Sequence, residues 1–134
     1  MITGGVTGIL VLGSIGEFFA IGKEEKKEII RFAVKTVKGR ARILVGTNSM
    51  IPGETVELSR FALDCGADGV VVVPPYYFTL TQESLYDFYR DLAASVEGDI
   101  YLYNFPDRTG YEISPELMLR LAKEFPNIVG CKDT

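Results

Sequence analysis

The chain of 134 residues contains only two cysteines and no surplus of basic residues. Cys65 and Cys131 lie far apart and lack CxxC spacing, so the sequence predicts reduced, buried thiols rather than a disulfide framework or a metal site. Lysine and arginine number 14 against 18 aspartates and glutamates, and the net charge of −4 argues against a nucleic-acid-binding surface. We expect the partner to be a small molecule or another protein.

Long apolar runs are also missing. The runs GILVLG and GVVVVPPYYF are far shorter than the roughly 20 residues that cross a bilayer, and Met1 is not followed by the basic and apolar regions of an export signal. The sequence therefore predicts a cytoplasmic protein without membrane contact. With 47% hydrophobic residues and six prolines, the composition is that of one ordinary globular domain.

Apolar runs alternate with amphipathic segments along the whole chain. In the segment 23–39, for example, Ile30, Val34 and Val37 recur at helical spacing beneath a charged face. The alternation predicts about five strands and four helices. The strands are expected within 5–13, 41–47, 67–77, 99–106 and 127–132, and the helices within 23–39, 53–66, 81–96 and 114–125.

The ends of these helices carry local signals. Thr81 and Ser114, the latter followed by Pro115, suit N-termini, while Gly39 and Gly66 suit C-terminal stops. The strand runs ILVLG and VVVV do not alternate with polar residues, so both of their faces should be covered, as in a parallel sheet.

Two parallel α/β architectures fit this pattern. In a doubly wound, nucleotide-binding fold, GSIGEF would be a fragment of a glycine-rich phosphate loop. In a (β/α)8 TIM barrel, functional side chains follow the C-terminal ends of several strands. The sequence favours the barrel, because hydroxyls, phenols and cations lie at or just beyond the C-terminal end of each predicted strand: Ser14, Thr47, Tyr77, Tyr103, Arg108 and Lys132.

Most of these side chains also have an ordinary structural interpretation. A serine between glycines is usually a turn residue, paired tyrosines such as Tyr76 and Tyr77 usually pack as aromatics, and Arg108 suits a solvated loop. Lys132 differs, because an unpaired ammonium on a buried strand costs several kcal/mol. Such a lysine commonly serves as a reactive amine.

A lysine, a phenol and a hydroxyl at one rim indicate carbonyl chemistry through a Schiff base. The neutral amine attacks a ketone, and the resulting iminium allows loss of a proton or cleavage of a carbon–carbon bond alpha to it. Tyrosine and serine hydroxyls relay the protons. The backbone amides of 13–16 suit a carboxylate beside that ketone, and a 2-oxo acid such as pyruvate has both groups.

The segments GSIGEFFAIGKEEKK, VPPYY, YNFPDRTG and GCKDT resemble the ordered motifs of the dihydrodipicolinate synthase and N-acetylneuraminate lyase family. These are pyruvate-dependent class I aldolases on a (β/α)8 barrel. The resemblance implies that Lys132 forms the Schiff base with pyruvate, without a metal or external cofactor, and that Tyr103 is the central proton-relay phenol. Ser14 and Ile15 occupy the positions of two threonines that bind the pyruvate carboxylate.

The resemblance also implies roles for two loop residues. Tyr77 matches a tyrosine that reaches across a dimer interface into the neighbouring site, which implies a homo-oligomer, a dimer or a tetramer. Arg108 matches an arginine that contacts the carboxylate of the incoming aldehyde in the synthases. An aldehyde is therefore the implied second substrate.

The sequence departs from the family pattern at Ile15, where the second threonine hydroxyl is missing, so the proton relay would run through Ser14. LGSIGEF, YNFP and CKDT look closer to the branch that cleaves 2-keto-3-deoxy sugar acids, whereas Arg108 leans towards the synthases. The resemblance implies a carbon–carbon lyase or aldolase. A barrel piece that has lost catalysis and serves in binding or assembly remains the alternative.

A (β/α)8 barrel usually needs about 250 residues, more than this chain supplies. MITGGVTG resembles the end of the family's first helix, so 1–134 is expected to be a single partial barrel domain that holds strands 2 to 6. Two sheet edges would then be uncovered. We expect the isolated polypeptide to be poorly soluble and to turn over pyruvate feebly, and catalysis to belong to a longer protein.

Overall fold

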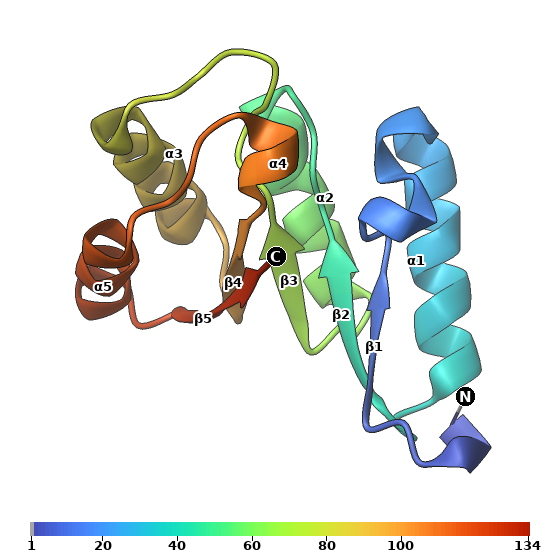
Figure 1. Cartoon of the computed structure of the whole chain (residues 1–134). Coiled ribbons are helices and arrows are strands. Elements are labelled where there is room, and N and C mark those ends of the chain that lie inside the picture. The colour runs from blue at the N-terminus through green and yellow to red at the C-terminus, as the bar shows by residue number, and fades with distance from the viewer. Residues whose placement is uncertain (1) are drawn as a thin grey trace.

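The computed structural model describes residues 2–134, and at its centre is one sheet of five parallel strands (Figure 1). The strands are β1 (Gly8–Val11), β2 (Arg42–Gly46), β3 (Gly69–Val72), β4 (Ile100–Asn104) and β5 (Ile128–Asp133). They lie side by side in sequence order, whereas a doubly wound sheet reverses its order at a switch point. The order is that of consecutive strands in a (β/α)8 barrel. The predicted partial barrel is confirmed, and the doubly wound alternative is wrong.

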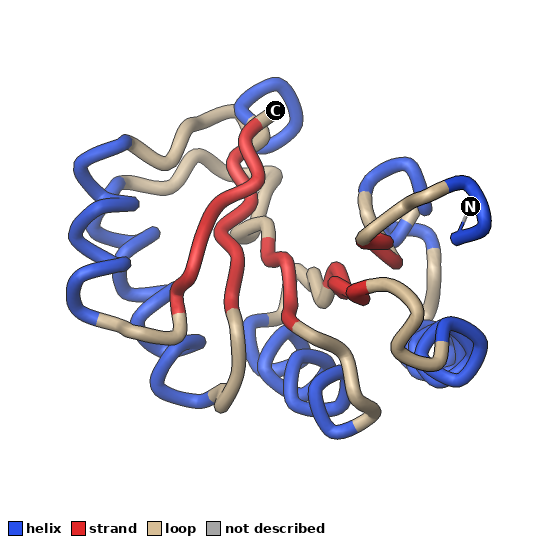
Figure 2. Tube along the Cα trace, turned by 90° about the horizontal axis from the view of Figure 1, so that it is seen from below, coloured by secondary structure: helices blue, strands red, loops and turns tan. Residues whose placement is uncertain are grey.

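A helix follows each of the first four strands, and these helices lie along one side of the curved sheet (Figure 2). None of the helices within residues 2–134 has the length and apolar character that a membrane span requires. The four helices are α1 (Lys23–Val37), α2 (Pro52–Asp64), α3 (Gln82–Ser95) and α5 (Pro115–Glu124).

The helix ends lie where the local signals predict them. The hydroxyls of Thr81 and Ser114 each accept a hydrogen bond from the backbone N–H three residues later, at 3.1 and 3.2 Å. Such N-cap bonds satisfy N–H groups that have no partner within the helix. Gly39 and Gly66 follow α1 and α2 with φ of 69° and 99°, the left-handed backbone that glycine adopts without steric cost.

Short helical turns occupy connections that the sequence does not identify. They are η1 (Ile2–Gly4), η2 (Ser14–Gly16), η3 (Phe18–Ala20) and the one-turn helix α4 (Pro106–Thr109). Because α4 starts at Pro106, β4 ends at Asn104, before the expected strand boundary. The turns η2 and α4 directly follow β1 and β4, so they shape the rim of the sheet.

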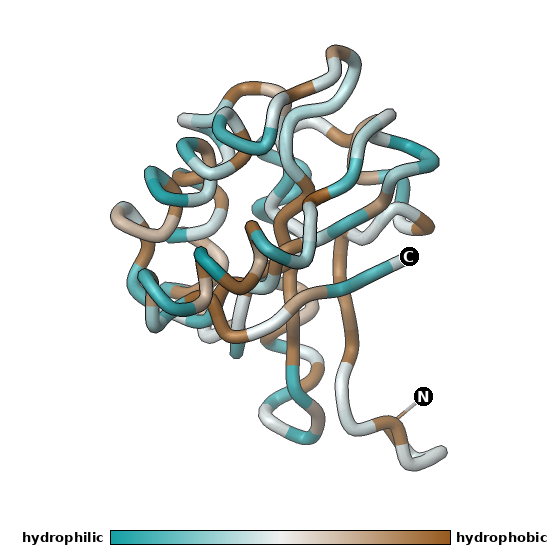
Figure 3. The backbone as a smooth tube through the Cα atoms, turned by 60° about the vertical axis from the view of Figure 1, so that its left-hand side comes forward, coloured by the Kyte–Doolittle hydropathy of each residue, from teal (hydrophilic) through white to brown (hydrophobic). Residues whose placement is uncertain are grey.

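Burial is complete in the middle of the sheet and incomplete at its edges. All residues of β3 are buried, and Figure 3 shows hydrophobic segments concentrated along the strands. Leu10 of β1 and Val129 of β5 are 37% and 46% exposed. The expectation that both faces of the first strand are covered is therefore wrong, because none of the four residues of β1 is fully buried. Within residues 2–134, no further strand pairs with the outer edge of β1 or of β5. The predicted uncovered edges are confirmed.

The open edge also changes the environment of one thiol. Cys65 is partly buried and Cys131, on β5, is exposed, and both are free. The expectation of free thiols is confirmed. The expected burial is wrong for Cys131, because Cys131 lies on the edge strand β5 and is exposed to solvent.

Candidate active site

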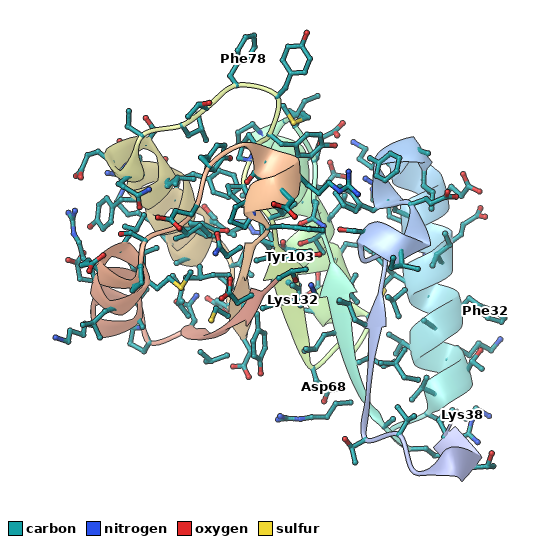
Figure 4. All side chains as sticks on the ribbon, viewed as in Figure 1. Phe32, Lys38, Asp68, Phe78, Tyr103 and Lys132 are labelled. Carbon is teal, nitrogen blue, oxygen red and sulfur yellow. The ribbon has the colours of Figure 1, made fainter. Side chains whose placement is uncertain are left out.

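Lys132 and Tyr103 lie side by side on β5 and β4, near the middle of the molecule (Figure 4). They are register partners in the parallel ladder, so their side chains emerge on the same face of the sheet. The ammonium nitrogen of Lys132 lies 3.9 Å from the centroid of the Tyr103 ring. The structure therefore brings the predicted amine and the predicted phenol into contact.

A register shift in the ladder creates this pairing. Ile100 pairs with Ile128, but Tyr101 pairs with Gly130, so Val129 has no partner on β4. A bulge of this kind inserts one residue into a strand and re-aims the side chains that follow. Without it, Tyr103 would face Cys131, and Lys132 would point to the opposite face.

Ser14, which follows β1 at the opposite edge of the sheet from β5, also contacts Tyr103. Its Oγ lies 3.1 Å from the Tyr103 hydroxyl, a hydrogen bond between residues 89 positions apart. Ser14 is the first residue of η2, whose turn is closed by Gly16 N–H donating to Gly13 O and Glu17 N–H donating to Ser14 O. The N–H groups of Ser14 and Ile15 do not take part in these two bonds.

The surroundings of Tyr103 change the acidity of its phenol. The residue is only 3% exposed, and burial alone raises the pKa of a phenol. The neighbouring Lys132 ammonium and Ser14 hydroxyl outweigh this effect, so the pKa of Tyr103 lies below its ordinary value. A phenol with a lowered pKa is better suited to exchange protons near neutral pH.

Lys132 itself is less enclosed than the sequence suggests. The expectation of a lysine on a fully buried strand is wrong, because β5 is the open edge and Lys132 is half-buried. Its Nζ donates a hydrogen bond of 2.5 Å to Thr134 Oγ1.

Phe105 is part of the site, although sequence reasoning did not single it out. Its ring stacks on that of Tyr103, with centroids 5.6 Å apart and planes 21° apart, and lies 5.8 Å from Lys132 Nζ. The alternation of Tyr101, Tyr103 and Phe105 at every second position was the available signal, because such residues share one face of a strand.

Asn104, a polar residue at the end of the fourth strand, fixes the ends of both site strands. Its Nδ2 donates to Asp133 Oδ1 at 2.8 Å, and its Oδ1 accepts from Ile113 N–H at 2.9 Å. The amide therefore joins β4 to β5 and to the loop before α5. A polar residue at a strand end was its only sequence signal.

A cavity of about 570 Å³ opens beside the Ser14–Tyr103 pair. Arg108, on α4, is the positively charged residue that lines this cavity. Ile15 also lines the cavity, although Ile15 is 99% exposed. The guanidinium of Arg108 lies 6.0 Å from the Phe105 ring. The other lining residues are Glu17, Phe18, Phe19, Val73, Tyr76, Phe105 and Thr109.

Tyr77 is the one predicted site residue that the structure does not bring to the others. Its side chain is 84% exposed, and its ring packs edge-to-face against Phe78 at 4.9 Å. Figure 4 shows Phe78 at the tip of the loop between β3 and α3, away from Lys132. Within residues 2–134 there is also no cluster of three or more histidine, cysteine or acidic residues that could hold a metal ion.

Curated relatives resemble this chain over less than half of their own length. A 4-hydroxy-tetrahydrodipicolinate synthase of Kosmotoga olearia is 49% identical over 129 residues, which are 96% of this chain and 44% of that protein. YagE of Escherichia coli K12, named as a candidate 2-dehydro-3-deoxy-D-gluconate aldolase, is 44% identical over 134 residues, all of this chain and 44% of YagE.

Solved structures give the same relationship. Dihydrodipicolinate synthase from Aquifex aeolicus superposes with a TM-score of 0.96 at 41% identity, over 99% of this chain and 45% of that one. YagE in complex with pyruvate superposes with a TM-score of 0.95, over 98% of this chain and 44% of YagE. The family model described as "Dihydrodipicolinate synthetase family" matches residues 1–134. The chain therefore belongs to the dihydrodipicolinate synthetase family.

Proposed function

We propose that residues 1–134 carry the catalytic half of a pyruvate-dependent lyase or aldolase that works through a Schiff base. The observation that supports this most strongly is the contact of the Lys132 amine with the Tyr103 ring, whose hydroxyl is hydrogen-bonded to Ser14. An amine next to a proton-relay phenol is the combination that imine chemistry needs.

In this proposal the Lys132 ammonium first loses a proton to solvent, and the free amine then attacks the ketone carbon of pyruvate. The carbinolamine then loses its hydroxyl as water, with Tyr103 supplying the proton, and an iminium forms. Loss of a methyl proton gives an enamine, whose carbon adds to an aldehyde; the reverse sequence cleaves that bond. Ser14 exchanges protons with Tyr103 through their hydrogen bond. The lysine is itself the covalent catalyst, so no further cofactor is required.

The carboxylate of pyruvate would lie at the turn that begins η2. The N–H groups of Ser14 and Ile15 remain outside the two hydrogen bonds that close this turn, and successive backbone N–H groups can bind an anion. Ile15 would contribute only its backbone, since its side chain has no hydroxyl.

The second substrate would be an aldehyde in the cavity beside Ser14. Arg108 lines this cavity, and a guanidinium suits a carboxylate on the aldehyde. The synthase and the sugar-acid aldolase among the relatives are the two models for the substrate. Arg108 favours an aldehyde that carries a carboxylate.

We further propose that the complete protein is a cytoplasmic homo-oligomer, a dimer or a tetramer, in which residues 1–134 supply strands 2 to 6 of each barrel. Tyr77 and Phe78 support this, because they form an exposed aromatic pair at the tip of the loop between β3 and α3, where a neighbouring subunit could cover them. In an oligomer Tyr77 would act in the neighbouring subunit's site. The free thiols support a reducing location.

Borohydride reduction in the presence of pyruvate, followed by intact-mass measurement and peptide mapping, tests the function. We expect one pyruvyl adduct on Lys132, abolished by Lys132→Ala and retained by Lys123→Ala, a control on α5. An adduct on another residue would contradict the mechanism. A folded protein without any adduct would favour a barrel piece that serves in binding or assembly.

A further inference from the structure

Gly46 is the last residue of β2 and lies buried against the end of β1. The last paired residue of β1 is Val11, opposite Val45. The next residue, Leu12, has a φ of 58°, in the left-handed region that leucine rarely adopts, yet it is only 5% exposed. The chain therefore leaves β1 through a sharp turn at Leu12, and the Leu12 side chain is buried in the core.

The turn at Leu12 is possible only because position 46 has no side chain. A Cβ on Gly46 would lie 2.2 Å from the carbonyl oxygen of Leu12 and 2.9 Å from its carbonyl carbon. Both are backbone atoms, which cannot swing aside like the tip of a flexible side chain. The same Cβ would also lie 3.1 Å from Asn48 Nδ2, which is buried.

A displacement of Leu12 would be transmitted to the site. Only Gly13 separates Leu12 from Ser14, and Phe18, on the far side of the turn, is buried at 5% exposure. An ordinary contact of 3.4 Å in place of 2.2 Å requires a shift of about 1.2 Å. The hydrogen bond between Ser14 and Tyr103 is 3.1 Å long, and hydrogen bonds are lost beyond about 3.5 Å.

We propose that Gly46 is a positioning residue for the reaction: by leaving room for the backbone of Leu12, it places the Ser14 hydroxyl on Tyr103. The catalytic meaning of this placement rests on the proposed function, whereas the placement itself does not. The atoms nearest to a Cβ at position 46 belong to Leu12 and Asn48 and not to Lys132, so Gly46 acts through Leu12 and Ser14.

Gly46→Ala in the full-length protein tests the placement, with Gly53→Ala as the matched control, because a Cβ at Gly53 meets nothing within 4 Å. The readout is the titration of ¹³Cζ-labelled tyrosines by NMR, with the Tyr103 signal assigned by its loss in Tyr103→Phe. The Ser14 hydroxyl helps to lower the pKa of Tyr103. We expect Gly46→Ala to raise this pKa as much as Ser14→Ala does, and Gly53→Ala to leave it unchanged.

A Tyr103 titration that stays at the wild-type value in folded Gly46→Ala would overturn the proposal. If Gly46→Ala does not fold, the double variant Leu12→Gly/Gly46→Ala replaces it, because glycine at position 12 makes the turn more adaptable. A raised Tyr103 pKa in the folded double variant would then support the proposal, and an unchanged one would overturn it. If that variant does not fold either, Gly46 is required for folding, and the positioning role is wrong.

Pyruvate trapping separates this inference from the proposed function. We expect adduct formation on Lys132 to slow on the order of 10²-fold in Gly46→Ala, the scale of a displacement of about 1 Å, and to be unchanged in Gly53→Ala. If the full-length wild type traps no pyruvate, the proposed function fails, while the tyrosine titration still decides whether Gly46 places Ser14.

Discussion

Lys132 is the register partner of Tyr103 because the β4–β5 ladder skips Val129. The pairing therefore depends on the number of residues in β5 before Lys132, and deleting or inserting one residue there tests it. We expect deletion of Val129 to remove the bulge and keep Lys132 opposite Tyr103, so that pyruvate trapping on Lys132 persists. Insertion of one alanine after Gly130 should turn Lys132 to the opposite face and abolish trapping. Trapping in the insertion variant, with a normal circular dichroism spectrum, would show that the register does not position the lysine.

Removal of the Tyr103 hydroxyl should slow the reaction without unfolding the protein. Tyr103→Phe deletes one oxygen and keeps the ring that stacks on Phe105. We expect turnover of the full-length protein to fall by about 10²–10⁴, the range for a lost proton-transfer group. Tyr101→Phe, two residues earlier on β4, is the control and should retain turnover. Equal rates for Tyr103→Phe and the wild type would assign Tyr103 a packing role only.

Arg108 should matter for the second substrate and not for pyruvate. Because Arg108 lines the cavity from α4, Arg108→Ala should raise KM for an aldehyde that carries a carboxylate by about tenfold or more, the value of one charged hydrogen bond. Pyruvate trapping on Lys132 should remain at the wild-type rate. Arg42→Ala is the control, because Arg42 lies at the N-terminal end of β2, away from the rim that carries Arg108. A loss of trapping in Arg108→Ala would indicate a structural role for the arginine.

Tyr111 should make the fold sensitive to alkaline pH. Its hydroxyl donates a hydrogen bond to Pro75 O, and burial raises its pKa from 10.0 to about 12. Between these values the unfolded chain loses the phenol proton and the folded chain retains it, so stability falls as pH rises above 10. Urea denaturation at pH 8 and pH 11 should show this loss in the wild type and a smaller one in Tyr111→Phe.

At pH 8 the Tyr111→Phe variant should be less stable by about 1 kcal/mol, because the hydrogen bond to Pro75 is lost. A wild type whose stability is equal at the two pH values, or a variant with the same loss, would mean that Tyr111 does not cause the alkaline sensitivity.

The sequence predicted features that depend on local pattern. The valine run in 70–73 and the helical spacing in 23–39 depend on near neighbours in the chain, and β3 and α1 are found there. The polar residues after each strand likewise predicted the rim at which Ser14, Tyr103 and Lys132 meet.

Other features depend on contacts between distant segments, which no local pattern encodes. The bulge at Val129 arises from the pairing of two strands, with Gly130 packed against the ring of Tyr101. Leucine gives no signal for a left-handed turn, so the conformation of Leu12 becomes intelligible only once Gly46 is seen beside it. The exposure of Cys131 follows from the position of β5 at the edge of the sheet.

The hydrogen bond between Ser14 and Tyr103 connects the end of β1 with the fourth strand of the sheet. Three strand spacings of about 4.8 Å would separate these strands by roughly 14 Å if the sheet were flat. The bond therefore crosses the inside of a curved sheet, and the Tyr103 side chain and the turn η2 cover part of the distance. A change in the curvature of the sheet would change the distance between these two hydroxyls, and with it the proton transfer between them.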